Sequence, residues 1–145
     1  MAANLAATSF LFSLYGNDAH TAAAHGWVRP GNMPVTLTAL TRYELGNALR
    51  FAAYRKIITP ANALSALAAF ESDLSAGYLR LETCDYAGIV EEARRLSGLY
   101  TLVGGHRSFD ILHVATARVL KARVFLSFDA NQRKLAAAVG LNAAP

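Results

Sequence analysis

Residues 106–136 constrain the fold more than any other stretch, because they combine a helix, a short strand and a second helix. Asp110 opens the first helix, and apolar residues follow it at three- and four-residue spacing. The run 124–128 is too short for a helix and is rich in residues that favour strands. Asp129 follows this strand and precedes the second helix. An open α/β sheet places its chemistry at such positions, so this stretch predicts an acidic site.

Strand-like runs alternate with helical segments along the whole chain. Strands are predicted at 4–8, 35–38, 78–82 and 124–128. Helices are predicted from a Thr8-Ser9 cap to 15, and over 19–28, 39–54, 60–76, 86–100, 110–120 and from 131. This alternation predicts an α/β fold with a central parallel sheet covered on both faces, which is a three-layer α/β/α sandwich. Since no linker or repeat interrupts it, residues 1–145 are expected to form a single domain.

The composition narrows the class of protein. The 145 residues are 54% hydrophobic with a mean hydropathy of +0.25, yet no run approaches the roughly 18 apolar residues of a membrane helix. The apolar start lacks a basic segment and is expected to be the first strand and helix, not a signal peptide. The single Cys84 excludes an internal disulfide and thiolate zinc sites, and a cytoplasmic location is expected. A net charge of +4 and a pI near 9.5 are compatible with nucleic-acid binding.

Three acidic residues are predicted to converge on one edge of the sheet. Right-handed crossovers put the carboxyl ends of parallel strands on one rim, so Thr8, Thr38 and Asp129 are expected on the same side. Glu44 lies about two helical turns beyond the second strand, and Asp110 opens the helix before the last strand. Each acid alone has an ordinary explanation, Glu44 as a solvated helix residue and the two aspartates as helix caps. Their shared position favours an acidic site.

A cluster of carboxylates requires either raised pKa values or a bound cation, because like charges repel. Oxygen ligands with few imidazoles favour Mg²⁺ or Mn²⁺, which activate water and clamp phosphate in nucleases and phosphatases. The histidines form no HExxH or His/Cys pattern, so His113 is predicted to be a packed helix residue, and His20 and His25 surface residues. No Walker loop, GxGxxG motif or serine nucleophile elbow occurs in the sequence.

The chain resembles the PIN-domain ribonucleases, in particular the VapC toxins of bacterial toxin–antitoxin pairs. The likeness spans nearly the whole chain, and the order and spacing of its short motifs make the combination specific. The matching segments are TSFL at 8–11 with LY at 14–15, YELGNALR at 43–50, RSFDILHVATA at 107–117, FLSFD at 125–129, and Gln132, Leu135 and GL at 140–141.

The resemblance implies a PIN-like fold and a metal-dependent endoribonuclease that uses four acidic residues. Three of them map onto Glu44, Asp110 and Asp129, which are thereby implied as catalytic residues and ligands of Mg²⁺ or Mn²⁺. Ser127, two residues before the last aspartate, is implied as a supporting hydroxyl. The first acidic residue of the family directly precedes the Thr-Ser pair, and this chain has Ala7 there. Since alanine cannot bind a metal, the chain is expected to have little or no nuclease activity.

Two explanations for Ala7 stay open at this point. An engineered inactive variant would protect an expression host from an RNA-cleaving toxin, whereas a naturally degenerate member would have lost the aspartate by decay. The intact remainder of the acidic set favours a single recent change, because long decay would alter several positions.

The resemblance also implies partners. These are an RNA substrate, a small VapB-type antitoxin whose C-terminal tail covers the acidic groove, and a second copy in a homodimer formed by the helices after the first strand and around 39–76. The arginines nearest the rim, which are candidates to bind RNA phosphates, are Arg42, Arg50, Arg107 and Arg133. Two alternatives remain: a catalytically silent PIN fold that binds RNA or protein, and a phosphatase or flavodoxin-like α/β protein unrelated to nucleic acid.

Overall fold

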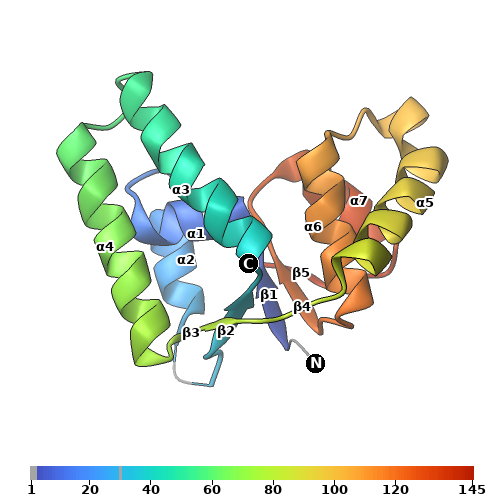
Figure 1. Cartoon of the computed structure of the whole chain (residues 1–145), viewed down its shortest axis with the longest axis horizontal. Helices are drawn as coiled ribbons and strands as arrows, with labels where there is room; N and C mark the ends of the chain where they lie inside the picture. Colours follow the sequence, from blue (N-terminus) through green and yellow to red (C-terminus); the bar gives the residue numbers. More distant parts are fainter. Residues whose placement is uncertain (1–2, 30) are drawn as a thin grey trace.

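The computed structural model describes residues 3–29 and 31–145 and is built around one parallel sheet (Figure 1). The strands are β1 (Asn4–Ala6), β2 (Val35–Leu37), β3 (Leu79–Leu81), β4 (Val124–Leu126) and β5 (Ala143–Ala144). They are ordered β3-β2-β1-β4-β5, and every neighbouring pair is parallel. The predicted α/β fold with a central parallel sheet is therefore confirmed.

Helices cover both faces of this sheet. They are α1 (Thr8–Tyr15), α2 (Thr21–Trp27), α3 (Ala39–Tyr54), α4 (Pro60–Ala76), α5 (Tyr86–Gly104), α6 (Ser108–Val119) and α7 (Ala130–Ala138). Alternate residues of a strand point to opposite faces, so Ala6 and Leu126 pack with α1 to α4, while Leu5 and Phe125 pack with α5 to α7. Figure 1 shows the two groups of helices on either side of the strands. The arrangement is the three-layer sandwich that the sequence predicts.

The two long helices of the first group follow the sequence signals closely, because α3 and α4 begin and end where predicted. Thr59 caps α4 by accepting a hydrogen bond from Asn62 N at 3.0 Å, and Pro60 occupies the first helical position. Gly77 ends α4 with a φ of 86°, a left-handed conformation that favours glycine. Neither these helices nor any other in the described residues has the length and apolar character needed to cross a membrane.

The strands are shorter than predicted. β1 ends at Ala6, and α1 starts at Thr8 with Ala7 as its N-cap, so the predicted Thr8-Ser9 cap is wrong. The chain turns out of the sheet here, while the Ala7 N–H still donates to the Leu126 carbonyl at 2.9 Å. β5 is not predicted by the sequence, because its two alanines carry no strand signal and its existence depends on pairing with β4.

Two helix starts differ from the prediction by two residues each. α2 begins at Thr21, two residues late, since the Asp18 side chain accepts from His20 N at 2.8 Å and closes a turn before the helix. α6 begins at Ser108, so Asp110 lies inside its first turn instead of at its start. The adjacent α5 runs to residue 104 instead of the predicted 100.

Candidate functional site

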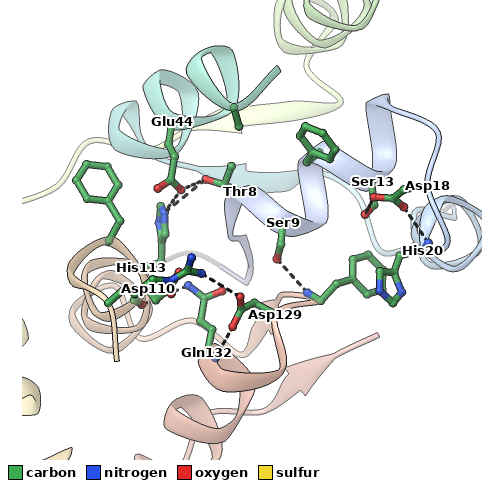
Figure 2. A pocket seen from close by; sticks show the side chains of 15 residues that line it. Thr8, Ser9, Ser13, Asp18, His20, Glu44, Asp110, His113, Asp129 and Gln132 are labelled. Atoms are coloured by element: carbon green, nitrogen blue, oxygen red, sulfur yellow. Dashed lines mark hydrogen bonds and ion pairs between the residues drawn. The ribbon is translucent and has the colours of Figure 1, made fainter. Parts of the chain in front are cut away.

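A pocket of about 540 Å³ opens at the edge of the sheet where β1 and β4 end (Figure 2). Glu44, Asp110 and Asp129 all line it, although they come from α3, α6 and the loop after β4. The structure therefore brings the three predicted carboxylates to one pocket. Its volume is within the range of roughly 300–1,000 Å³ that is usual for small-molecule and cofactor sites.

Glu44 is held on one side of the pocket by two side chains. Its Oε1 lies 2.7 Å from His113 Nε2, and the Thr8 hydroxyl donates to the same oxygen. The Glu44 side chain is 28% exposed, whereas His113 is 4% exposed. Burial acts to raise the pKa of Glu44, but the hydrogen bonds from His113 and Thr8, together with the charges of His113 and Arg107, leave that pKa below its ordinary value.

His113 is the residue that sequence reasoning missed. It is a buried helix residue as predicted, but it also contacts Glu44 across 69 residues of sequence. Its spacing of three residues from Asp110 puts both side chains on one face of α6. That spacing is the one sequence signal that points from the acidic set to His113.

Asp110 and Asp129 are joined by an arginine on the other side of the pocket. Arg107 Nε lies 2.9 Å from Asp110 Oδ2, and its Nη2 lies 3.3 Å from Asp129 Oδ2. The Arg107 side chain is 76% exposed, so this ion pair faces solvent. The hydrogen bond to Asp110 is the main reason that the pKa of Arg107 is raised, and the charges of Asp129 and Glu44 add to it. The guanidinium thus neutralises part of the acidic pocket.

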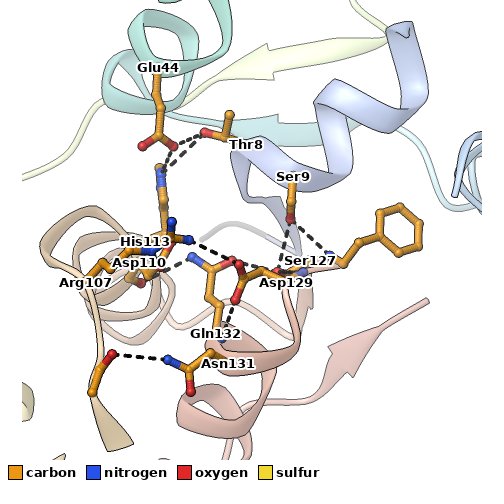
Figure 3. Close-up of polar contacts among 12 residues, drawn as sticks. Thr8, Ser9, Glu44, Arg107, Asp110, His113, Ser127, Asp129, Asn131 and Gln132 are labelled. Carbon is orange, nitrogen blue, oxygen red and sulfur yellow. Dashed lines mark hydrogen bonds and ion pairs between the residues drawn. The ribbon is translucent and has the colours of Figure 1, made fainter. Parts of the chain in front are cut away.

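A buried polar network supports Asp129 from below (Figure 3). Ser127, which is fully buried, donates to Gln132 Oε1 at 2.6 Å and accepts from Asp129 N at 3.1 Å. Gln132 N donates to Asp129 Oδ1 at 2.8 Å, and its side-chain amide donates to the Asp110 carbonyl at 3.2 Å. Ser9 Oγ lies 3.2 Å from Ser127 Oγ. The network fixes the loop after β4 against α1, α6 and α7.

Ala7 lies between β1 and α1, at the same edge of the sheet. It is 1% exposed and belongs to the core on the side of α5 to α7. As the N-cap of α1 it makes no side-chain hydrogen bond, in a position where aspartate is a preferred residue. A carboxylate at this buried position requires a positive partner. The alanine itself offers neither a capping acceptor for α1 nor a metal ligand.

The residues present do not complete a metal centre. Within 3–29 and 31–145, no group of three or more His, Cys, Asp or Glu side chains is placed to hold an ion. Glu44, Asp110 and Asp129 carry carboxylate oxygens, which are the ligand atoms that Mg²⁺ and Mn²⁺ prefer. However, Glu44 is bonded to His113, Asp110 and Asp129 are paired with Arg107, and Ala7 contributes no donor.

The arginines expected near the rim have different surroundings. Arg107 lines the pocket, whereas Arg42 pairs with Glu71 of α4 at 2.7 Å. Arg133 donates to the Ser127 carbonyl at 2.8 Å and so supports the loop after β4. Arg107 is therefore the member of this set that the pocket lining includes.

Comparison with known proteins gives a family and a fold. A family model for the PIN domain matches residues 7–138, and no curated protein matches the chain. The chain is similar to the crystal structure of VapC20 from Mycobacterium tuberculosis, a sarcin-ricin loop cleaving toxin, with 20% identity, a TM-score of 0.69 and 96% of each chain covered. It is also similar to PAE2754 from Pyrobaculum aerophilum, with 17% identity, a TM-score of 0.66, and 98% of this chain and 89% of that chain covered. At these identities the similarity shows a shared fold.

Proposed function

Because the chain belongs to the PIN domain family, we propose that its pocket is the catalytic centre of a metal-dependent endoribonuclease, a VapC-type toxin, which Ala7 leaves inactive. The observation that carries this proposal is the convergence of Glu44, Asp110 and Asp129 on one pocket, with a neutral residue at the fourth acidic position. Family membership also removes the basis for a flavodoxin-like alternative.

Mg²⁺ or Mn²⁺ is the cofactor that the proposal requires. Its ligands would be Glu44, Asp110, Asp129 and an aspartate at position 7, which together supply the oxygen donors that these ions prefer. In the unmodified chain, His113 and Arg107 hold the three carboxylates in place. These contacts orient the carboxylates but do not make a complete set of metal ligands. Ser127 supports the site by fixing the backbone of Asp129.

RNA is the proposed substrate. Arg107 is an exposed cation beside the carboxylates, and an arginine in such a place can bind a phosphate of the RNA backbone. The similar toxin VapC20 is described as cleaving the sarcin-ricin loop, which makes that RNA a suitable first probe for the present chain.

A VapB-type antitoxin and a second copy of the chain are the proposed protein partners. Support for a homodimer through α3 and α4 comes from exposed apolar side chains on and just after these helices. Phe51 and Tyr54 stack at 5.9 Å between ring centroids, and the others are Tyr43, Ile57 and Leu64. A monomer at all concentrations in analytical ultracentrifugation would contradict the homodimer.

A catalytically silent PIN fold that binds RNA or protein is the second candidate. The observation that favours it is the salt bridge of Arg107 to both Asp110 and Asp129, which offsets part of the negative charge of these two carboxylates without a metal. The two candidates agree on the fold and differ on whether an aspartate at position 7 produces cleavage.

Cleavage of RNA by three proteins tests the proposal. A sarcin–ricin loop oligoribonucleotide and a structured RNA pool are incubated with Mn²⁺ or Mg²⁺ and the unmodified chain, the Ala7→Asp variant, or Ala7→Asp combined with Asp129→Ala. We expect metal-dependent cutting by the second protein alone. The gain should be about 100-fold or more, since partners of metal ligands alone are worth about 10–100-fold and residue 7 would be a direct ligand. No cutting by an Ala7→Asp variant that binds Mn²⁺ would favour the silent binding module.

A further inference from the structure

The pocket has a second, aromatic end that the acidic residues do not use. Figure 2 places His20 at the opposite end of the pocket from Glu44 and His113. His20 and Phe128 line the pocket together with Phe12 and Asp18. Phe128 directly precedes Asp129, so the two α-carbons are separated by about 3.8 Å, and the aromatic end adjoins the acidic one.

Three aromatic rings form a continuous stack at this end. The His20 ring lies 4.5 Å from the Phe128 ring with an interplanar angle of 9°. Phe128 in turn stacks on Phe10 at 5.8 Å and 19°, and the fully buried Phe10 meets the edge of Trp27 at 6.0 Å. The stack therefore begins in the core and ends at an exposed imidazole.

Hydrogen bonds hold the His20 turn in place before any ligand arrives. Asp18 accepts from the buried Ser13 hydroxyl at 2.8 Å and from His20 N at 2.8 Å. Thr21 Oγ1 accepts from Asp18 N at 2.9 Å and donates to the Ser13 carbonyl at 2.7 Å. Phe128 N donates to Ser9 Oγ at 3.0 Å, which fixes the other partner of the stack. The turn and the loop after β4 are both tied to α1.

The His20 ring itself is available to a ligand. One face of it is covered by Phe128, and within the described residues no other ring stacks on it and no hydrogen bond involves its nitrogens. The residue is exposed although it lines the pocket. A planar aromatic surface that is fixed on one face and open on the other is the arrangement on which proteins stack unpaired nucleobases.

We propose that the open face of His20, backed by Phe128, is a stacking site for an unpaired nucleobase of the RNA whose backbone lies along the acidic end of the pocket. This inference takes its substrate class, RNA, from the proposed function. It adds a requirement on the conformation of that RNA. The nucleotide next to the cleaved bond must be single-stranded, because a paired base cannot present its face to His20. The site reads the plane of a base and not its identity, since every base has such a face.

Equilibrium binding to the unmodified chain tests the stacking site without cleavage. Fluorescence anisotropy is measured in EDTA with two labelled probes: a single-stranded oligoribonucleotide of mixed sequence, and an abasic ribose-phosphate oligomer of the same length. His20→Ala should weaken binding of the first probe by about 5- to 150-fold, the equivalent of about 1–3 kcal/mol per stacked base. It should leave the abasic probe unchanged. His20→Phe keeps a ring and should bind the first probe as the unmodified chain does.

His25→Ala is the matched control, because His25 is an exposed histidine of α2 that bonds to the Leu14 carbonyl and does not line the pocket. It should change neither affinity. Equal weakening of both probes by His20→Ala, or loss of binding in His20→Phe, would mean that the imidazole contacts phosphate and would overturn the stacking site. Unchanged RNA binding in His20→Ala, alongside cleavage by Ala7→Asp, would overturn the stacking site alone. Absence of RNA binding and cleavage in every protein would overturn the proposed function as well.

Discussion

Glu44 and the pair Asp110 and Asp129 line the same pocket, yet the protein holds them in different ways. Glu44 accepts two hydrogen bonds from the half-buried or buried side chains of Thr8 and His113. Asp110 and Asp129 share one cation, Arg107, whose side chain is largely in solvent. A partly buried contact of this kind is shielded from solvent, whereas an exposed ion pair gives way to water, salt or another ion. One side of the pocket is thus fixed, and the other is held by a replaceable cation.

The largest effect on stability is expected when the contact between His113 and Glu44 is removed. His113→Ala removes a buried ring and leaves Glu44 without its nearest donor, so the free energy of unfolding should fall by about 2–3 kcal/mol. Urea denaturation measures this value, and His25→Ala, which changes an exposed histidine, should cost less than about 0.5 kcal/mol. Equal costs for the two substitutions would contradict a stabilising role for the buried ring of His113 and its contact with Glu44.

The buried support beneath Asp129 should show the next largest effect. Ser127→Ala leaves Gln132 Oε1 without its donor at a fully buried position and removes the acceptor for Asp129 N. We expect a loss of about 1–2 kcal/mol in urea denaturation. Ser127→Ala with unchanged stability would mean that the loop after β4 does not depend on this hydroxyl, and that Arg107 and Gln132 N are sufficient to restrain Asp129.

Glu92 provides a reference for an ion-paired carboxylate outside the pocket. Hydrogen bonds from Arg95 and Arg118 outweigh burial and lower the pKa of Glu92 to about 2. The group therefore contributes stability above its ordinary pKa of 4.5, and this contribution is lost as the pH falls from 4.5 toward 2. After allowance for solvent, its size should be about 1 kcal/mol.

Glu92→Gln should accordingly lower the melting temperature at neutral pH and have less effect at pH 2.5, where Glu92 is already partly protonated. Thermal unfolding followed by circular dichroism at the two pH values measures the difference. A cost that stays the same at both pH values would contradict the ion pair as its source.

The smallest effect on stability is expected for the replaceable cation. Arg107→Gln breaks both ion pairs, but the side chain is exposed, so the cost should be about 0–1 kcal/mol. The substitution should matter for metal binding instead, because it removes a competitor for Asp110 and Asp129. In the Ala7→Asp background we expect Arg107→Gln to bind Mn²⁺ more tightly in calorimetric titration. Weaker binding would mean that Arg107 orients the carboxylates and does not compete for them.

The sequence predicts the architecture well because its strongest signals are local. α4 is bounded by Thr59, Pro60 and Gly77, whose preferences are properties of single residues. The convergence of Glu44, Asp110 and Asp129 on one pocket follows from the parallel sheet, since its strand ends share one edge.

What the sequence does not predict depends on contacts between distant residues. The bond of His113 to Glu44 joins α6 to α3, and no local pattern reports it. The salt bridge of Arg107 to Asp129 likewise depends on how the loop after β4 lies against α6. The sequence alone therefore predicts only that Arg107 is a candidate to bind RNA phosphates. His20 reads as a surface residue, and its stacking on Phe128 follows only from the fold. Whether Glu44, Asp110 and Asp129 are catalytic stays a prediction.

Calorimetric titration of Mn²⁺ into three proteins tests whether residue 7 completes the acidic site. The proteins are the unmodified chain, Ala7→Asp, and Ala7→Asp combined with Asp129→Asn. We propose that the missing carboxylate at position 7 is the main obstacle to a complete acidic centre, beyond the contacts of the three carboxylates with His113 and Arg107. We therefore expect Ala7→Asp to bind Mn²⁺ at least about tenfold more tightly than the unmodified chain, a difference of about 1.4 kcal/mol. The added Asp129→Asn should abolish that gain. Equal affinity in the unmodified chain and in Ala7→Asp would contradict the claim, because the pocket would then not depend on residue 7.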